Sequence, residues 1–416
     1  MKLFSISTIF LVSSLFGGLL PLVSAQEEPD ACEAALQARV DCYDSDDYPI
    51  SCDPLPIPAV GFGPNSPDPS KGYFIQELRT DLHAVSEGSY FAMVGIANRS
   101  KRMNRKNYEL AIFDFPEGGF VQRDETGQVI GNSFTNAVDE IVQEVYGLEP
   151  EEVRKVQMVY SHGHMDHIGG ATIMYNHILE TYPKAVIEII GSESVQEEFD
   201  ERIDSEWEGS FSFRAPLPTT VIKNKKVNMP IGRSLKYSLT PAYGHSGDKD
   251  LIVFFEASEG ESAVMMFIDV IFPGWAPFFS FAISTDIFQF REVHHKILEE
   301  FDFGEDGGHF VGGHLTKIGT KADIEMSLAL FDAIIAGAQK GLQTADPNAI
   351  AAEYGIFDPS SPNVGNQWLL FDLYFKDVVK VCAKEVLAEF GCKVAALDIV
   401  LDSHCRSAQS YLRVDF

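Results

Sequence analysis

The chain has 416 residues, of which 32 are Lys or Arg and 61 are Asp or Glu, so its formal net charge is −29. Hydrophobic residues make up 45% of it, which is enough for a large core and excludes a disordered acidic protein. The acidity argues against a nucleic-acid partner, because phosphates need basic residues to neutralise them. It also argues against docking on an anionic membrane.

Residues 1–25 predict a secretory signal peptide. Lys2 is the only charged residue, an apolar stretch follows from Leu3 to Leu20, and Ala25 ends a small-residue cleavage site. We therefore expect a secreted protein, extracellular or in the lumen of the secretory pathway, with no membrane attachment after cleavage. An uncleaved anchor is the alternative. The sequon that begins at Asn98 predicts a glycosylated surface loop.

The six cysteines form two groups of three, one near each end of the chain. An even number in a secreted chain suggests three disulfides, and this placement suggests that the two ends are joined. Six cysteines allow 15 pairings, among which the sequence does not choose. A zinc–cysteine site is the alternative, but no CxxC pair occurs. The cysteines are Cys32, Cys42, Cys52, Cys382, Cys392 and Cys405.

Three parts are expected after the signal peptide. Residues 26–70, rich in Pro, Asp and Cys, form an N-terminal extension with one helix at 31–40. Residues 71–342 form the main domain. Residues 343–416 form a helical extension that carries the late cysteines, which favours a fixed cap over a mobile lid.

Within the main domain, runs of β-branched and aromatic residues alternate with stretches of helical spacing. The expected strands are 78–84, 89–96, 109–115, 153–160, 185–190, 235–239, 250–256, 263–270 and 309–311. The expected helices are 132–146, 170–180, 193–202, 288–301 and 320–342, followed in the extension by 366–390 and 393–412. Thr320 and Asp323 make a capping box. This order fits an α/β fold in which helices cover the outer faces of sheets.

A polar cluster of the form His-x-His-x-Asp-His directly follows the expected strand 153–160. It consists of His162, His164, Asp166 and His167. Imidazole is the commonest metal ligand in proteins, and Asp adds an anionic oxygen. Nearby glycines let the backbone turn tightly. Such a cluster can hold two metal ions side by side.

Further candidate ligands follow other apolar strands downstream. These are His245, Asp269 and His314, each with glycine or a strand end beside it. His309 is a rival for the last position, but we expect it at the other end of its strand. His294 and His295 are adjacent on an expected helix, where they point about 100° apart and chelate poorly.

With these residues in place, the chain resembles the metallo-β-lactamase-fold hydrolase superfamily over about 78–335. That resemblance implies a four-layered αβ/βα sandwich with two divalent metal ions, zinc in the first place and iron or manganese as alternatives. It makes 71–342 the catalytic domain. One metal would take His162, His164 and His245, the other Asp166, His167 and His314, with Asp269 between them.

Two metals in such a site imply hydrolysis, because coordination lowers the pKa of a bound water toward 7 and supplies hydroxide at neutral pH. Asp166 is a candidate to relay a proton. Tyr243, two residues before His245, is a candidate donor to a developing oxyanion, with a packed strand-end tyrosine as the alternative.

The leading hypothesis is a hydrolase that opens an acyl bond of a small-molecule substrate, in a lactone, ester, thioester or β-lactam. The aromatic segment 272–281 beside Asp269 favours an apolar lactone or ester, although it serves equally well as core, and Trp275 is the residue to test. An iron-dependent sulfur dioxygenase or a sulfatase-type enzyme of the same fold is the alternative. A non-catalytic binding protein is the third hypothesis.

Overall fold

The computed structural model describes residues 29–43, 53–55, 68, 70–100, 106–117, 120–123, 129–203, 215–245, 250–315 and 317–414. The expected signal peptide lies outside these residues. The chain divides into two compact units, which are described separately here. Unit 1 contains 64–221 and 229–236, and unit 2 contains 28–63, 222–228 and 237–416. Among the described residues, no helix is long and apolar enough to cross a membrane.

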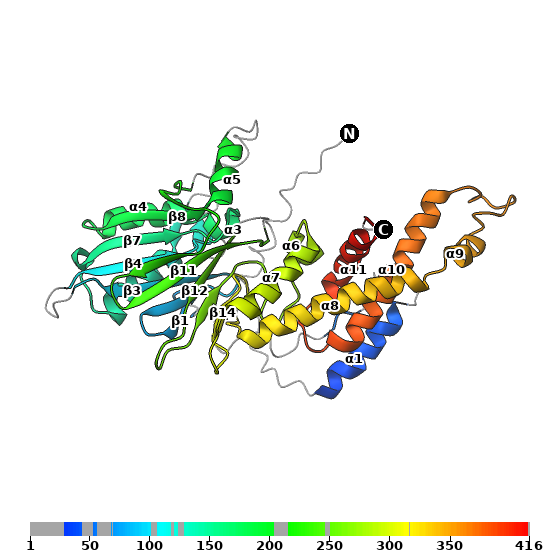
Figure 1. Ribbon diagram of the computed structural model, residues 1–416, viewed down its shortest axis with the longest axis horizontal. Helices are drawn as coiled ribbons and strands as arrows, with labels where there is room; N and C mark the ends of the chain where they lie inside the picture. The colour runs from blue at the N-terminus through cyan, green and yellow to red at the C-terminus, as the bar shows by residue number, and fades with distance from the viewer. Residues whose placement is uncertain are drawn as a thin grey trace. The chain divides into compact units, whose positions relative to one another are not determined.

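Unit 1 contains a seven-stranded sheet (Figure 1) with the strand order β1-β2-β3-β4-β7-β8-β9. Neighbours from β1 to β4 run antiparallel, whereas β4, β7 and β8 run parallel. Parallel strands end at the same edge of a sheet, so the loops after β4 and β7 begin side by side. The strands are β1 (Phe74–Arg79), β2 (Leu82–Ser86), β3 (Phe91–Asn98), β4 (Tyr108–Phe113), β7 (Val153–Val159), β8 (Val186–Ser192) and β9 (Thr220–Ile222).

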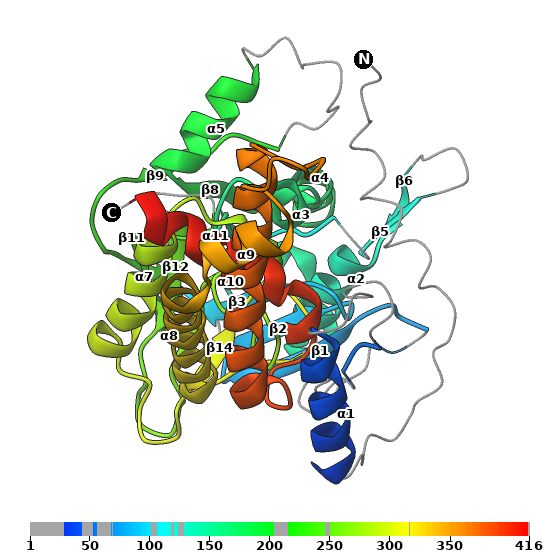
Figure 2. The same cartoon turned by 90° about the vertical axis from the view of Figure 1, so that its right-hand side faces the viewer.

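The helices of unit 1 share one apolar cluster with the sheet. Ile112 and Met158 of the strands belong to the same buried cluster as Ile141 and Met174 of the helices. Beside α2 lies a separate two-stranded ribbon (Figure 2), β5 (Val121–Arg123) with β6 (Val129–Asn132). The helices are α2 (Ser133–Glu140), η3 (Ile141–Val145), η4 (Pro150–Glu152), α3 (Met165–Ile168), α4 (Ala171–Thr181) and α5 (Glu193–Ile203).

A second sheet has the order β10-β11-β12-β13-β14. Its last pair, β13 and β14, is parallel, so the loops after these two strands again begin at one edge. The strands β11 to β14 lead into unit 2, and β10 spans the boundary between the units. They are β10 (Val227–Ile231), β11 (Leu235–Ala242), β12 (Asp250–Phe255), β13 (Val264–Met266) and β14 (His309–Val311).

Helices make up most of unit 2 and bury one large apolar cluster with the strands β12 to β14. The long helices α8 and α10 run beside each other (Figures 1 and 2). The expected capping box opens α8, where the Thr320 amide donates to the Asp323 carboxylate at 2.9 Å. The helices are α1 (Pro29–Cys42), α6 (Phe279–Ile283), α7 (Ile287–Glu300), α8 (Lys321–Thr344), α9 (Pro347–Glu353), α10 (Gln367–Phe390) and α11 (Leu397–Val414).

Covalent and ionic links join the N-terminal helix to the C-terminal helices. A disulfide connects Cys32 in α1 with Cys392, as the expected joining of the two ends requires. A second disulfide, Cys382–Cys405, links α10 to α11. Cys42 is disulfide-bonded as well. Near them, Arg39 of α1 pairs with Asp398 of α11 at 3.3 Å.

The expected α/β class, with sheets, helices and a disulfide-bearing helical C-terminal region, is confirmed. Two expected strands were wrong in detail. The run 78–84 is a hairpin, because Asp81 adopts a left-handed conformation (φ 67°) between β1 and β2, as Asp tolerates in turns. The run 263–270 is a strand only as far as Met266, since Asp269 is also left-handed (φ 61°) and ends the extended backbone.

Candidate metal centre

The histidine cluster of unit 1 lies on the loop between β7 and the short helix α3. His162 follows two residues after Tyr160, His164 is the N-cap residue of α3, and Asp166 and His167 lie within that helix. The backbone amides of His167 and Ile168 donate to the His164 carbonyl, which fixes the turn. We expected from the sequence that a strand runs directly into this loop, and the structure confirms this strand.

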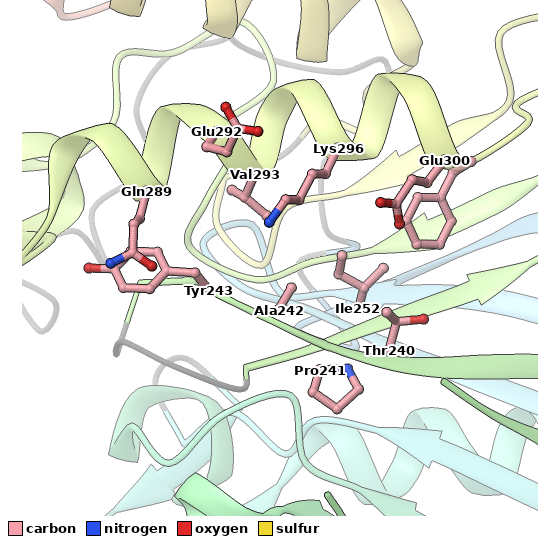
Figure 3. A pocket seen from close by; sticks show the side chains of 11 residues that line it. Thr240, Pro241, Ala242, Tyr243, Ile252, Gln289, Glu292, Val293, Lys296 and Glu300 are labelled. Atoms are coloured by element: carbon pink, nitrogen blue, oxygen red, sulfur yellow. The ribbon is translucent and has the colours of Figure 1, made fainter. Parts of the chain in front are cut away.

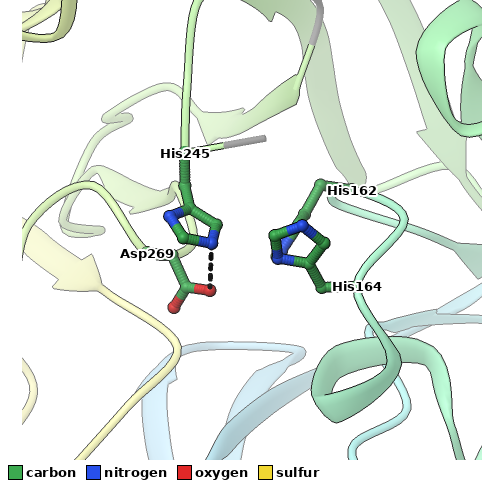
Figure 4. A group of neighbouring side chains, drawn as sticks. All are labelled: His162, His164, His245 and Asp269. Carbon is green, nitrogen blue, oxygen red and sulfur yellow. Dashed lines mark ion pairs between the residues drawn. The ribbon is translucent and has the colours of Figure 1, made fainter. Parts of the chain in front are cut away.

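The imidazole rings of this loop gather around one point. The ring centroids of His162 and His164 are 4.7 Å apart (Figure 4), and those of His162 and His167 are 4.9 Å apart. His162 and His167 are buried, whereas His164 and Asp166 are half-exposed. The Asp166 carboxylate lies 3.5 Å from Nε2 of His167. Unit 1 therefore brings together all four donors that the sequence singled out there.

Asp114 is hydrogen-bonded to the first residue of the histidine loop. It follows β4, is completely buried, and accepts the amide and the hydroxyl of Ser161, both at 2.7 Å. The Ser161 hydroxyl also contacts Nδ1 of His162 at 3.0 Å, and the Asp114 carboxylate lies 3.8 Å from Nδ1 of His167. The Ser161 contact occupies Nδ1 of His162 and leaves Nε2 of that ring for a metal, as outer partners of metal-binding histidines do.

Asp114 was not among the residues predicted from the sequence, although its position after an apolar run could have indicated it. Asp114 directly follows an apolar run at a strand end, as Asp269 nearly does. Because β4 and β7 are parallel neighbours, this places it at the same sheet edge as the histidine loop.

Gly163 faces the carboxylate of Glu198. A Cβ atom at residue 163 would lie 2.1 Å from Oε2 of Glu198, a residue of α5, so no larger residue fits without displacing that carboxylate. Gly170 is similarly close to the backbone and donates its amide to the Phe115 carbonyl at 2.7 Å. The tight turns inferred from the glycines are therefore present.

In unit 2, Asp269 and His314 lie next to each other after the parallel strands β13 and β14. Nε2 of His314 is 2.9 Å from Oδ1 of Asp269, and both side chains are buried. The Asp269 amide donates to the carbonyl of Gly312, which couples the two loops. His309 begins β14 at the opposite end from His314, as the sequence led us to expect.

His245 follows the end of β11 and faces the same aspartate. Its Nε2 lies 4.0 Å from Oδ2 of Asp269 (Figure 4). The preceding Gly244 has no room for a side chain, because a Cβ atom there would be 2.3 Å from Oδ2 of the buried Asp250. Unit 2 thus places both of its expected histidine donors, His245 and His314, beside the carboxylate of the third, Asp269.

Two phenylalanines flank His314. The Phe272 ring is stacked on the imidazole with 6.0 Å between centroids, and the Phe278 ring meets it edge-on at 5.0 Å. Phe272 is buried, but Phe278 is 41% exposed. Trp275, which the sequence marked as the test residue of this segment, packs partly buried against the core of unit 2.

Tyr243 lies at the wall of a small pocket between β11 and α7 (Figure 3). Its hydroxyl is 3.0 Å from the Thr285 hydroxyl, and Gln289 is beside it in the pocket. Lys296, Glu292 and Glu300 line the same pocket of about 240 Å³. The contact with Thr285 gives Tyr243 a structural partner, and its role toward an oxyanion stays a prediction.

Two histidines outside the cluster are buried and neutral. Burial lowers the pKa of His294 to about 4, and this ring bonds the Phe290 carbonyl and the Ser327 hydroxyl. Burial also lowers the pKa of His404 to about 4. Two nitrogens of His294 are thus in contact with other groups of unit 2, and this residue lies outside the group of candidate ligands.

The donors in each unit suit a divalent metal. Imidazole nitrogens and carboxylate oxygens, held by buried hydrogen-bond partners and tight glycine turns, are the ligand set of zinc, iron and manganese sites. Sulfur ligands are absent from both groups of donors, so the ligand set does not resemble a structural cysteine site.

No family model and no curated protein matches the chain. Solved structures similar to it include DIM-1 metallo-β-lactamase exposed to ceftazidime (14% identity, TM-score 0.43), covering 62% of this chain and 96% of that one. A β-lactamase domain protein from Burkholderia ambifaria has 11% identity and a TM-score of 0.47, with 85% and 92% covered. The inverting sec-alkylsulfatase Pisa1 from Pseudomonas sp. has 10% identity and a TM-score of 0.49, with 92% and 62% covered.

Proposed function

We propose that the chain is a dinuclear metallo-hydrolase of the metallo-β-lactamase fold. One metal would be held by His162, His164 and His245. The other would be held by Asp166, His167 and His314, with Asp269 shared between the two groups. The observation that carries the proposal is the packing of three imidazoles and a carboxylate on one loop, oriented by the buried Asp114.

Bound divalent metals would supply the Lewis acidity that activates a water molecule and polarises an acyl carbonyl. The chain's own residues have separate tasks. Asp114 and Ser161 hold the imidazole of His162 in one orientation. Asp166 is half-exposed, so it is the carboxylate of the loop best placed to exchange a proton with solvent. Phe272 and Phe278 exclude water from one side of His314.

We further propose an acyl bond as the one that is hydrolysed, in a lactone or an ester before a thioester or a β-lactam. Phe278 supports this choice, because it is exposed while it touches His314. An exposed ring next to a candidate ligand favours a substrate with an apolar part. The surplus of acidic residues disfavours a phosphodiester in a nucleic acid.

We propose that the protein is secreted. The disulfides Cys32–Cys392 and Cys382–Cys405 support this, because such bonds persist in oxidising compartments and are rare in the cytosol.

Metal content and turnover test the proposal together. The zinc-loaded chain is assayed by proton release on a lactone, an aryl ester, a thioester, a β-lactam, a phosphodiester and a sulfate ester, and its metals are counted by mass spectrometry. We expect two zinc ions per chain and release from one acyl class, abolished by chelation and by His162→Ala. His177→Ala is the control, since His177 pairs with Asp139 outside the cluster.

Other results would point elsewhere. A chain that binds one iron and consumes oxygen with a thiol substrate would replace the hydrolase by an oxidative enzyme. Release from the sulfate ester alone would replace the acyl bond by a sulfate ester. A chain that binds no metal would overturn the proposal.

A further inference from the structure

Helix α6 (Phe279–Ile283), which contains the end of the aromatic segment 272–281, is a left-handed turn built without glycine. Ser280, Phe281 and Ala282 have φ near 55°, and Ile283 has φ 62°. L-residues disfavour this conformation because Cβ approaches the following carbonyl, and consecutive left-handed residues are rare. Interactions from outside the turn must therefore hold it.

Helix α11 supplies these interactions, although it lies more than 100 residues later in the chain. The Ser403 hydroxyl accepts the Ser280 amide at 2.9 Å, and Nδ1 of His404 accepts the Phe281 amide at 2.9 Å. The other ring nitrogen, Nε2, lies 3.2 Å from the Pro277 carbonyl and donates to it. Both nitrogens of His404 are thus committed to the backbone of the segment.

His404 is suited to this task because it is completely buried and uncharged. Burial lowers its pKa to about 4, so at neutral pH the ring has one accepting and one donating nitrogen. The two backbone groups that it contacts, an amide and a carbonyl, require this combination.

The connection between α10 and α11 holds the start of the same segment. The Ala395 amide donates to the Gly274 carbonyl at 2.9 Å, and the Ala276 amide donates to the Ala395 carbonyl at 3.0 Å. The disulfide Cys382–Cys405 fixes α11 to α10 next to His404. The C-terminal helices therefore hold the segment 274–281 at both of its ends.

The held segment presents apolar side chains to solvent beside a candidate ligand. Phe278 is 41% exposed and touches the His314 ring edge-on. Phe279 is 57% exposed, and Ile283 is 71% exposed. We call these three side chains the apolar rim. Phe278 contacts the candidate ligand, and Phe279 and Ile283 follow it closely in the same short turn. Exposed apolar residues concentrated in this way favour a binding surface over scattered surface residues.

We propose that helix α11 determines substrate specificity, with His404 as the positioning residue that holds the apolar rim beside His314 to bind an apolar chain of the substrate. The inference rests on the proposed metal centre and names the substrate class for it. The occupant is an aliphatic acyl chain or ring attached to the bond that is hydrolysed, because the rim begins at a residue that touches a ligand.

Binding of hydroxamates tests the inference without turnover, because they chelate zinc and differ only in chain length. On the zinc-loaded protein, we expect octanohydroxamate to bind at least tenfold more tightly than acetohydroxamate in calorimetry. Phe279→Ala and His404→Leu should reduce this preference to threefold or less and leave acetohydroxamate affinity within twofold. His404→Gln, which keeps an acceptor and a donor, should restore part of it.

His294→Leu is the matched control. His294 is equally buried and has the same pKa of about 4, but its nitrogens contact Phe290 and Ser327 instead of the segment. The His294→Leu variant should be less stable than the wild type but should keep the preference for octanohydroxamate over acetohydroxamate. Hydrogen exchange gives a second readout: amides of 278–284 should exchange at least tenfold faster in His404→Leu and unchanged in His294→Leu.

The outcomes separate the inference from the proposed function. If the protein binds zinc and binds both hydroxamates with equal affinity, the proposed role of the apolar rim is wrong and the proposed metal centre stands. A preference that survives in His404→Leu with faster exchange overturns the role of His404. A protein that binds no zinc overturns the proposed function and this inference with it.

Discussion

Asp114 and Ser161 form two hydrogen bonds of 2.7 Å each in the interior of unit 1. This pair links the end of β4 to the first residue of the histidine loop. Ser161 passes the contact on to Nδ1 of His162, so one buried carboxylate orients a ring that the metal would bind.

Asp114→Asn should therefore weaken metal binding. The amide keeps the size of the side chain but removes the charge that favours the oriented, metal-bound imidazoles, and we expect a 10- to 100-fold loss of zinc affinity. Competition with a chromophoric chelator measures this. Asp139→Asn is the control, because Asp139 accepts from Tyr182 in the same unit away from the loop. Equal affinities in both variants would contradict the role of Asp114.

Gly163→Ala should displace the Glu198 side chain and leave the histidine loop in place. The new Cβ would lie 2.1 Å from Oε2 of Glu198, which is the far end of a flexible side chain and can move away. We expect this variant to keep most of the wild-type zinc. Gly170→Ala should bind less than half of it, because the new Cβ would lie 3.0 Å from the backbone carbonyl oxygens of Phe115 and Pro116, which cannot rotate away. Equal zinc content in the two variants would contradict this difference.

Arg39→Met should destabilise unit 2 strongly. Arg39 and Asp398 are both buried, and the Leu55 amide also donates to the Asp398 carboxylate. Removing the cation leaves a buried carboxylate without its charge partner, which costs about 3–5 kcal/mol. Urea unfolding with intact disulfides measures the loss. The double variant Arg39→Met/Asp398→Leu should lose less free energy of unfolding than Arg39→Met. A loss in Arg39→Met below about 1 kcal/mol would contradict the argument.

The buried histidines make stability fall in acid. The folded pKa of His294 is about 4, below the ordinary value of 6.5. Above pH 6.5 the His294 ring is neutral in both states and does not change the free energy of unfolding. As pH falls from 6.5 toward 4, the unfolded state takes up the proton first, so the free energy of unfolding decreases. The shift corresponds to about 3 kcal/mol at its limit. In urea unfolding from pH 7.5 to 5, His294→Leu should show a smaller decrease than the wild type, and parallel curves would contradict this.

Local patterns made much of the site predictable from sequence. The donors His162 to His167 lie within six residues, and Asp269 and His314 each follow an apolar run closely, so spacing alone indicated them. Asp114 also follows an apolar run, but no histidine lies near it in the sequence to mark it as part of a metal site. Its importance comes from the parallel pairing of β4 with β7, which brings distant residues to one edge.

The features that sequence could not give are long-range. Ser280 to Ile283 contain no glycine and no turn signature, so nothing local indicates a left-handed turn, which tertiary contacts from α11 impose. The pair Arg39 and Asp398 is separated by 359 residues. Nothing in the sequence around either residue indicates that it is buried.

The Cys32–Cys392 bond has a consequence for biosynthesis. Its two cysteines are 360 residues apart, and α1 is made long before α10 and α11 exist. During translation, the helix α1 has neither its disulfide partner nor Asp398 to neutralise Arg39. Its docking must come after almost the whole chain has been synthesised, so assembly of unit 2 is post-translational and requires Cys32 to be free, or to be released by thiol–disulfide exchange, at that time.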